Sequence, residues 1–337
     1  MILASLELHD LVSVLRVNRT LHSISLRTLY RALPRDLSPI QSVKCLQTIS
    51  KNDLVAGLVR SLHIDWAALF RPSLGLFRLL HTALRRLSKL TVLSLELRVF
   101  ANFELPITWI FQGCSFSLNV FISSIRCDQS LADFLHSQSK IVELGLRGFG
   151  GTGAFTLRPS SLPHLQSLRV VHADTSVLES VVRGRPIENV TLTVAPGDGF
   201  KVLRALKLST KEVLRLSILT LEFATPEEVL TEVGACMPGL LALQILIVNS
   251  TQVTASRSFF SFLSVFDQDH SHTLFFFSRS LPGGGLSCSR RSKVWSISRL
   301  WIHAYASTFR IRFRWFRIGT STVLRLGPLY YPEIECW

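Results

Sequence analysis

The sequence repeats a six-residue pattern with apolar side chains at its first, fourth and sixth positions. Complete copies begin at residues 59, 90, 141, 165, 187, 216 and 243, and a degraded copy, Leu118-x-x-Phe121, fills the gap between the second and the third. Successive copies start 22 to 31 residues apart. Each copy alternates like a short strand, and one such unit cannot bury its own apolar face. We therefore expect the copies to stack with parallel strands and to present an extended binding face rather than a catalytic cleft.

Helices are predicted in several connectors between these copies, from apolar residues at spacings of three and four. They cover 74–87, 131–137, 176–182 and 226–236, the last with Thr225 as its N-cap. Residues 1–33 have the same helical spacing, and Pro34 and Pro39 are predicted to end it. Strand alternating with helix at this period resembles the leucine-rich repeats. The expected fold class is α/β, an irregular leucine-rich-repeat solenoid (horseshoe) with a short N-terminal helical cap.

The tail, residues 255–337, differs from the rest of the chain. It holds 11 Lys/Arg and 4 Asp/Glu, a net charge of +7, which is half of the chain's +14. Leucine hexads stop there, Phe, Ser and Arg predominate, and Pro282-Gly-Gly-Gly285 would interrupt a helix or strand. We expect a poorly structured tail, either as a genuine basic extension or as sequence that is not native coding, such as a retained intron or a shifted frame.

A stretch of the tail, 309–318, alternates arginine with aromatic and aliphatic residues. Arginines on phosphates and aromatics stacked on bases would bind single-stranded nucleic acid. No recognisable nucleic-acid module surrounds the stretch, so we do not expect this partner, and the arginines would then only keep the tail in solution.

Composition and motifs argue against several other classes of protein. The six cysteines are scattered without a C-x-x-C pair, which favours reduced thiols in the cytoplasm or nucleus over disulfides or zinc. No apolar run is long enough to span a membrane, and the first residues lack the basic start of a secretory signal. Residues 148–153 fit G-x-G-x-x-G, but Pro159 and Pro163 leave no room for the helix that a dinucleotide needs, so a loop is expected. We predict a protein that is not an enzyme and has no metal or cofactor.

The N-terminal segment 11–31, LVSVLRVNRTLHSISLRTLYR, resembles the second half of an F-box. It is most similar to the variety that precedes irregular leucine-rich repeats in large families of mushroom-forming fungi, whose repeats resemble residues 109–118 and 131–148. The resemblance implies a substrate-recognition subunit of a cullin-based (SCF-type) ubiquitin ligase. In that family the F-box binds a Skp-type adaptor and the repeats bind a protein substrate. The resemblance places the adaptor contacts at Leu11, Leu15, Val17, Leu21 and Leu26.

The F-box resemblance is incomplete, because the Leu-Pro opening and the first helix of a full F-box have no counterpart in this sequence. The same leucines could instead pack as a cap on the first repeat. An adaptor-independent scaffold for protein interactions therefore stays open as the alternative function. We divide the chain into an F-box-like remnant (1–40), the repeats (41–254) and the tail (255–337), and expect a monomer within a complex.

The substrate is expected to contact residues that lie between the apolar positions of the hexads, because these would face outward. An ordinary solvated sheet face is the other interpretation of the same residues. They are Arg60, His63, Thr91, Ser94, Glu143, Gly145, Ser167, Arg169, Asn189, Thr191, Thr220 and Ile245.

Overall fold

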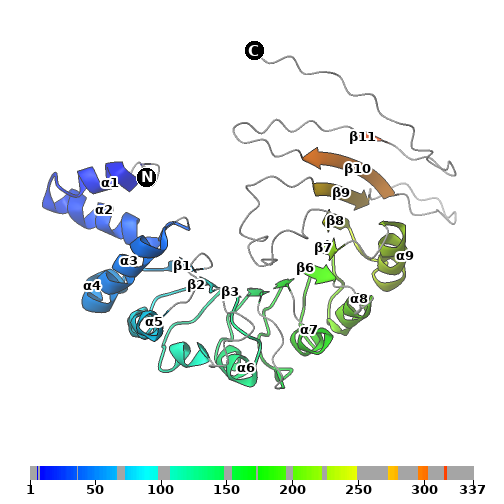
Figure 1. Ribbon diagram of the computed structural model, residues 1–337, viewed down its shortest axis with the longest axis horizontal. Helices are drawn as coiled ribbons and strands as arrows, with labels where there is room; N and C mark the ends of the chain where they lie inside the picture. The colour runs from blue at the N-terminus through cyan, green and yellow to red at the C-terminus, as the bar shows by residue number, and fades with distance from the viewer. Residues whose placement is uncertain are drawn as a thin grey trace, which may run out of the picture.

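A sheet with eight parallel strands and a set of helices make up this chain in the computed structural model, a mixed α/β structure. The structure describes residues 6, 8–35, 37–66, 73–97, 107–147, 154–171, 174–194, 200–221, 226–248, 272–279, 295–302 and 315–316. The sheet is curved, and the helices that connect its parallel strands lie on its outer side (Figure 1).

Each of the eight parallel strands overlaps one of the eight predicted hexads, in the predicted frame for the first six. They are β1 (Ser61–Asp65), β2 (Val92–Glu96), β3 (Val120–Ser123), β4 (Glu143–Leu146), β5 (Ser167–Val170), β6 (Asn189–Val194), β7 (Arg215–Leu221) and β8 (Ala242–Val248). Each strand pairs in parallel with the next one along the chain, so sequence order and spatial order agree. Parallel strands need a crossover between them, and the connectors supply it.

Helices form in the four connectors for which the sequence predicts them. They are α5 (Leu74–Arg86), α6 (Gln129–His136), α7 (Thr175–Val182) and α9 (Pro226–Cys236). Asp128 caps α6, since its Oδ1 accepts a hydrogen bond from the Leu131 amide at 2.9 Å. The predicted cap of α9, Thr225, lies outside the described residues. Three shorter pieces complete the outer side: the 3₁₀ helices η2 (Ile107–Phe111) and η3 (Leu206–Leu208), and α8 (Lys201–Ala205).

The N-terminal region is helical, with one correction to the prediction. Helices α1 (Leu8–Val14) and α2 (Arg19–Arg31) lie where expected, but Pro39 begins a third helix, α3 (Pro39–Lys51), rather than ending a pattern. Ser38 and Gln41 form a capping box there, each side chain accepting from the other's backbone amide. Proline suits the first helical position because its missing N–H has no partner to lose. A short helix, α4 (Asp53–Ala56), follows.

The buried core consists of the apolar hexad positions and the inner faces of the helices. Trp66, directly after β1, is fully buried and donates from Nε1 to the Ser42 hydroxyl at 2.8 Å, which fixes α3 to the first strand. All three apolar positions are buried in the hexads that start at residues 59, 90, 141, 165 and 187. Burial of these side chains is the main term holding consecutive units together.

The last two hexads lie three residues earlier than the sequence analysis places them. Leu216 pairs in register with Val190 of β6, which makes it the fourth position of its hexad rather than the first. The true copies are therefore 213–218 and 240–245, with Ile218 and Ile245 in the core. Leu219, taken as an apolar position in the predicted frame, is only partly buried. Both frames are apolar in sequence, and only the register with the neighbouring strand separates them.

Three strands of the tail extend the sheet beyond β8, where the sequence analysis expects poor structure. Strands β9 (His272–Arg279), β10 (Trp295–Ile302) and β11 (Trp315–Phe316) pair antiparallel in succession, starting on β8. Of the alternating stretch 309–318, only β11 is described. The other residues of 255–337 lie outside the described residues.

Candidate recognition face

The candidate site is the face of the parallel sheet turned away from the helices, called here the open face. Alternate residues of each strand point to it, because successive side chains of a strand point to opposite faces. Parallel register aligns them in three rows that run across the strands. The first row is Ser61, Val92, Val120, Glu143, Ser167, Asn189, Arg215 and Ala242, and the second is His63, Ser94, Ile122, Gly145, Arg169, Thr191, Ser217 and Gln244. The third, at the carboxyl ends of β1 to β4, is Asp65, Glu96, Ser124 and Arg147.

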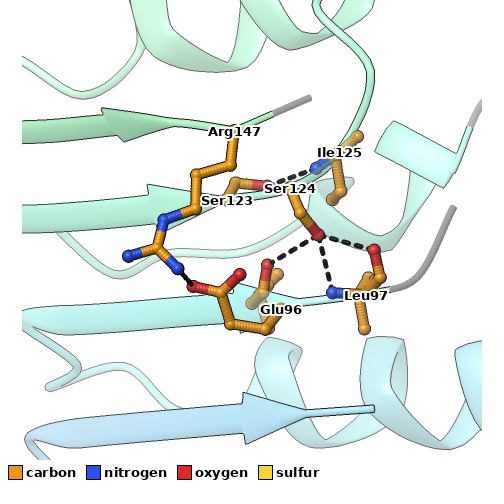
Figure 2. Close-up of polar contacts among 7 residues, drawn as sticks. Glu96, Leu97, Ser123, Ser124, Ile125 and Arg147 are labelled. Carbon is orange, nitrogen blue, oxygen red and sulfur yellow. Dashed lines mark hydrogen bonds and ion pairs between the residues drawn. The ribbon is translucent and has the colours of Figure 1, made fainter. Parts of the chain in front are cut away.

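An ion pair spans three strands at the carboxyl end of this face (Figure 2). Arg147, which follows β4, donates from Nη1 to Oε1 of Glu96 at the end of β2, at 2.6 Å. Between them Ser124, which follows β3, accepts from the Leu97 amide at 2.7 Å and donates to the Leu97 carbonyl at 2.6 Å. Three consecutive units are thus joined through polar side chains in addition to the backbone ladder.

Burial shifts the pKa of the Glu96 carboxyl more than its attraction to Arg147 does. The side chains of Glu96 and Arg147 are 24% and 28% exposed. Desolvation raises the pKa of the Glu96 carboxyl, Arg147 opposes that shift, and the neighbouring Asp65 carboxylate adds to it. Asp65 is in register with Glu96 on the adjacent strand, so two like charges face each other at this corner. The positive charge of the Arg147 guanidinium offsets the repulsion between these two carboxylates.

A second ion pair lies at the middle of the face. Arg169 of β5 approaches Glu143 of β4, with 3.1 Å between Nη2 and Oε1. Its arginine is 48% exposed, so the pair contributes no more than about 1 kcal/mol to stability. From β5 onward the face carries hydroxyl and amide groups, and the Ser217 hydroxyl donates to Oε1 of Gln244 at 3.2 Å. This half of the face can form hydrogen bonds with a backbone laid across it.

The face is apolar over β2 and β3. Val92, Val120 and Ile122 are each partly exposed there. Ile122 lies over Gly145, where an added Cβ would come within 3.0 Å of its Cγ2. Glycine at this position therefore makes room for the isoleucine side chain, which packs over it and stays partly exposed at the face.

Five of the predicted substrate residues form one continuous patch over β4 to β6, and the others lie elsewhere. That patch comprises Glu143, Ser167, Arg169, Asn189 and Thr191.

Arg60 and Thr91 lie just before their strands and bind backbone. Arg60 donates from Nη1 to the Lys89 carbonyl at 3.0 Å, and Thr91 donates to the Arg60 carbonyl at 3.1 Å. His63 lies apart on β1, within 2.8 Å of the Ser61 hydroxyl.

Three of the predicted contacts, Ile245, Ser94 and Gly145, are corrected or limited by the structure. Ile245 is fully buried in the core, because the true hexad frame makes it an apolar position rather than an outward one. Ser94 is 9% exposed and Gly145 is covered by Ile122, so both lie at the face but offer a partner little surface. The side chain of Thr220 lies outside the described residues.

Sequence reasoning missed several residues of the open face. Arg215, Ser217 and Gln244 belong to it but were hidden by the shifted frame of the last two hexads. Glu96 and Arg147 were missed because they follow the sixth hexad position, which the motif does not include. Extending the alternation by one residue beyond each hexad would have found them.

The predicted adaptor contacts divide by exposure. Leu11 is buried, Leu15, Leu21 and Leu26 are partly buried, and Val17 is 65% exposed in the turn between α1 and α2. Two further apolar residues of this helical pair are exposed, Val12 at 40% and Ile24 at 43%.

Other classes of site find little support in the part of the chain that is described. Its His, Cys, Asp and Glu side chains form no group of three or more that could hold a metal ion. None of its helices combines the length and apolar character needed to cross a bilayer. The glycines at 148–153 lie outside the described residues.

A scan against protein-family models finds no match, and a search among curated proteins finds none either.

Proposed function

We propose that this chain is an irregular leucine-rich-repeat solenoid that recognises a protein substrate for a cullin-based ubiquitin ligase. In this proposal the open face binds the substrate, and the α1–α2 pair, an F-box-like remnant, binds a Skp-type adaptor. The proposed activity is binding, so the protein supplies no chemistry of its own.

The observation that carries the proposal is that helices cover only one of the two sides of the parallel sheet among the described residues. Helices cover one side and bury the hexad residues, whereas the other side presents aligned rows of partly exposed polar and apolar groups. A stack of repeats with one free face is the arrangement by which solenoids bind extended partners.

The α1–α2 pair supports the adaptor part of the proposal. It joins the sheet at its end, where Ala32 forms a single parallel bridge with Ser61. Val12, Val17 and Ile24 remain exposed on the pair, and these apolar side chains are available for contact with an adaptor.

An adaptor-independent scaffold is the second candidate, and the burial of Leu11 favours it. A leucine that is already buried within the fold cannot also be inserted into a partner without a rearrangement around it. Under the scaffold hypothesis the open face still binds a protein partner, but the chain is not part of a ubiquitin ligase.

Co-purification with a Skp-type adaptor tests the ligase hypothesis. The full chain and the adaptor would be co-expressed, with Val17→Asp as the disruptive variant and Leu54→Asp as its control. Leu54, in α4, is 80% exposed against 65% for Val17, so the control adds the same charge to an apolar position that is at least as exposed. The proposal expects the adaptor to follow the wild type and the control but not Val17→Asp. Recovery of the folded chain without adaptor would favour the scaffold.

A further inference from the structure

The first row of the open face forms a continuous track across six strands. Parallel register connects Val92, Val120, Glu143, Ser167, Asn189 and Arg215 in that order, one residue per strand. A chain lying on this track crosses the strands and meets these side chains one after another.

The apolar end of the track is built by Val92, Val120 and Ile122. All three are partly exposed, and the side chain of Ile122 packs closely over Gly145 on the next strand. Beyond them, toward the carboxyl ends of the strands, the Glu96–Arg147 ion pair closes the patch. An aliphatic side chain of a partner placed here would remove apolar surface from water on both molecules.

The middle of the track is polar and can accept a backbone. Ser167 and Asn189 are neighbours in register and partly exposed, and their side chains offer both donors and acceptors. Glu143 is already engaged by Arg169, so this stretch has little net charge to offer.

The other end of the track carries the positive charge of Arg215. Arg215 is exposed, and within the described residues no carboxylate forms an ion pair with it. In contrast, the two other arginines of the face, Arg147 and Arg169, are paired with Glu96 and Glu143. A guanidinium in this state favours a carboxylate from a partner, which it can bind through two parallel hydrogen bonds.

We propose that the open face binds an extended segment of a partner protein that carries an aliphatic residue and an acidic residue at a fixed separation. The aliphatic residue lies over Val92, Val120 and Ile122, and the carboxylate binds Arg215. This inference rests on the proposed substrate-binding role of the face and names the chemical class of the substrate.

The spacing follows from the geometry of sheets. Val120 and Arg215 lie four strands apart, and neighbouring strands are about 4.8 Å apart, so the two subsites are separated by roughly 19 Å. An extended chain advances about 3.3 Å per residue, so this distance corresponds to about six residues. The sheet curves toward its open face, which shortens the path above it, so five residues is the lower expectation.

Peptide arrays probed with the full chain test the inference. Each array would hold random 12-residue peptides with one Leu and one Asp fixed at separations from two to nine. We expect binding to be strongest at separations of five and six and to fall at least tenfold when Asp becomes Asn or Leu becomes Ser. Equal signal at all separations would overturn the inference.

Variants assign the binding to the track. Arg215→Glu should weaken binding of the best peptide at least tenfold in fluorescence polarisation, and a peptide with Lys in place of Asp should then bind better to Arg215→Glu than to the wild type. Val120→Thr, which keeps the side-chain shape, should also weaken binding. Lys201→Glu is the control, because it makes the same charge reversal at the start of α8, on the helix side of the sheet. Unchanged affinity of Arg215→Glu would overturn the inference.

Failure of this inference is separable from failure of the ligase hypothesis. No adaptor enters the peptide assays, so co-purification with the adaptor is unaffected by their result. If the wild type, folded by circular dichroism, binds no peptide of the arrays, the proposed substrate class is wrong even where the adaptor still co-purifies.

Discussion

Replacing Arg185 with Met should destabilise the fold more than any substitution of a surface arginine. Arg185 is fully buried, and no carboxylate among the described residues forms an ion pair with its guanidinium. Instead the guanidinium donates to five backbone carbonyls at 2.7 to 3.1 Å, which belong to Arg158, Ser161, Ser180, Val181 and Arg183. Desolvation lowers its pKa to about 10, so the side chain keeps its charge at neutral pH.

The expected loss in the free energy of unfolding follows from the hydrogen bonds that these carbonyls lose. Ser180 and Val181 lie in the last turn of α7, where carbonyls lack helical partners, so Arg185 acts as a cap for that helix. The Arg158 carbonyl also accepts from the Ser161 amide at 2.9 Å and would keep one bond. The other four would lose their charged donor at about 1 kcal/mol each, which gives a loss of roughly 3–5 kcal/mol.

Urea denaturation followed by circular dichroism measures this loss. The matched control is Arg183→Met, two residues away, because Arg183 is 61% exposed and its ion pair with Glu179 is 3.9 Å long. That control should change the free energy of unfolding by less than about 1 kcal/mol. Hydrogen exchange should also accelerate at the end of α7 in Arg185→Met. A loss below about 1 kcal/mol in Arg185→Met would refute the reasoning.

Three further predictions concern packing, pH and thiols. Gly145→Ala should cost about 1–3 kcal/mol in chemical denaturation because its Cβ meets Ile122, and the cost should disappear in an Ile122→Ala background; equal costs in both backgrounds would contradict the packing argument. Burial, assisted by the positive charge of Arg35, lowers the pKa of His63, so the unfolded chain binds a proton at this residue more readily than the folded chain does. The free energy of unfolding should therefore fall as the pH drops below about 6.5, and His63→Gln should reduce that fall. Burial raises the pKa of Cys45 to about 11 and that of Cys127 to about 12, so native iodoacetamide labelling at pH 8 should be at least ~100-fold slower than in urea, and fast native labelling would count against the burial.

The parallel sheet could be predicted from the sequence because each hexad marks one strand, so the recurrence of the hexads along the chain gives the order of the strands. Each hexad supplies three buried side chains, and a unit with such a face must stack. The frame of the last two hexads could not be fixed in this way. Residues 213–221 contain apolar side chains in both frames, and the choice depends on pairing with β6, a contact between units rather than a property of one unit.

Other features escaped prediction because they depend on residues distant in sequence. Glu96 and Arg147 meet across 51 positions, and neither differs in sequence from an ordinary surface charge. Arg185 likewise has no motif, since its partners are backbone carbonyls that any residue could supply. Pro39 differs from the prediction for another reason, because a proline can stand at either end of a helix and Ser38-Pro39-Ile40-Gln41 forms a helix start.

Polar side chains serve different purposes on the two sides of the sheet. On the helix side they bind backbone: Gln138 accepts from the Leu118 amide at 3.0 Å, and Ser209 donates to the Arg185 carbonyl at 2.9 Å. At the centre of the open face Arg169 instead pairs with Glu143, a partner that another molecule can replace. Substitutions on the helix side should therefore change stability first, whereas substitutions along the open face can change binding while leaving the fold intact. That separation is what allows the peptide experiments to report on recognition rather than on folding.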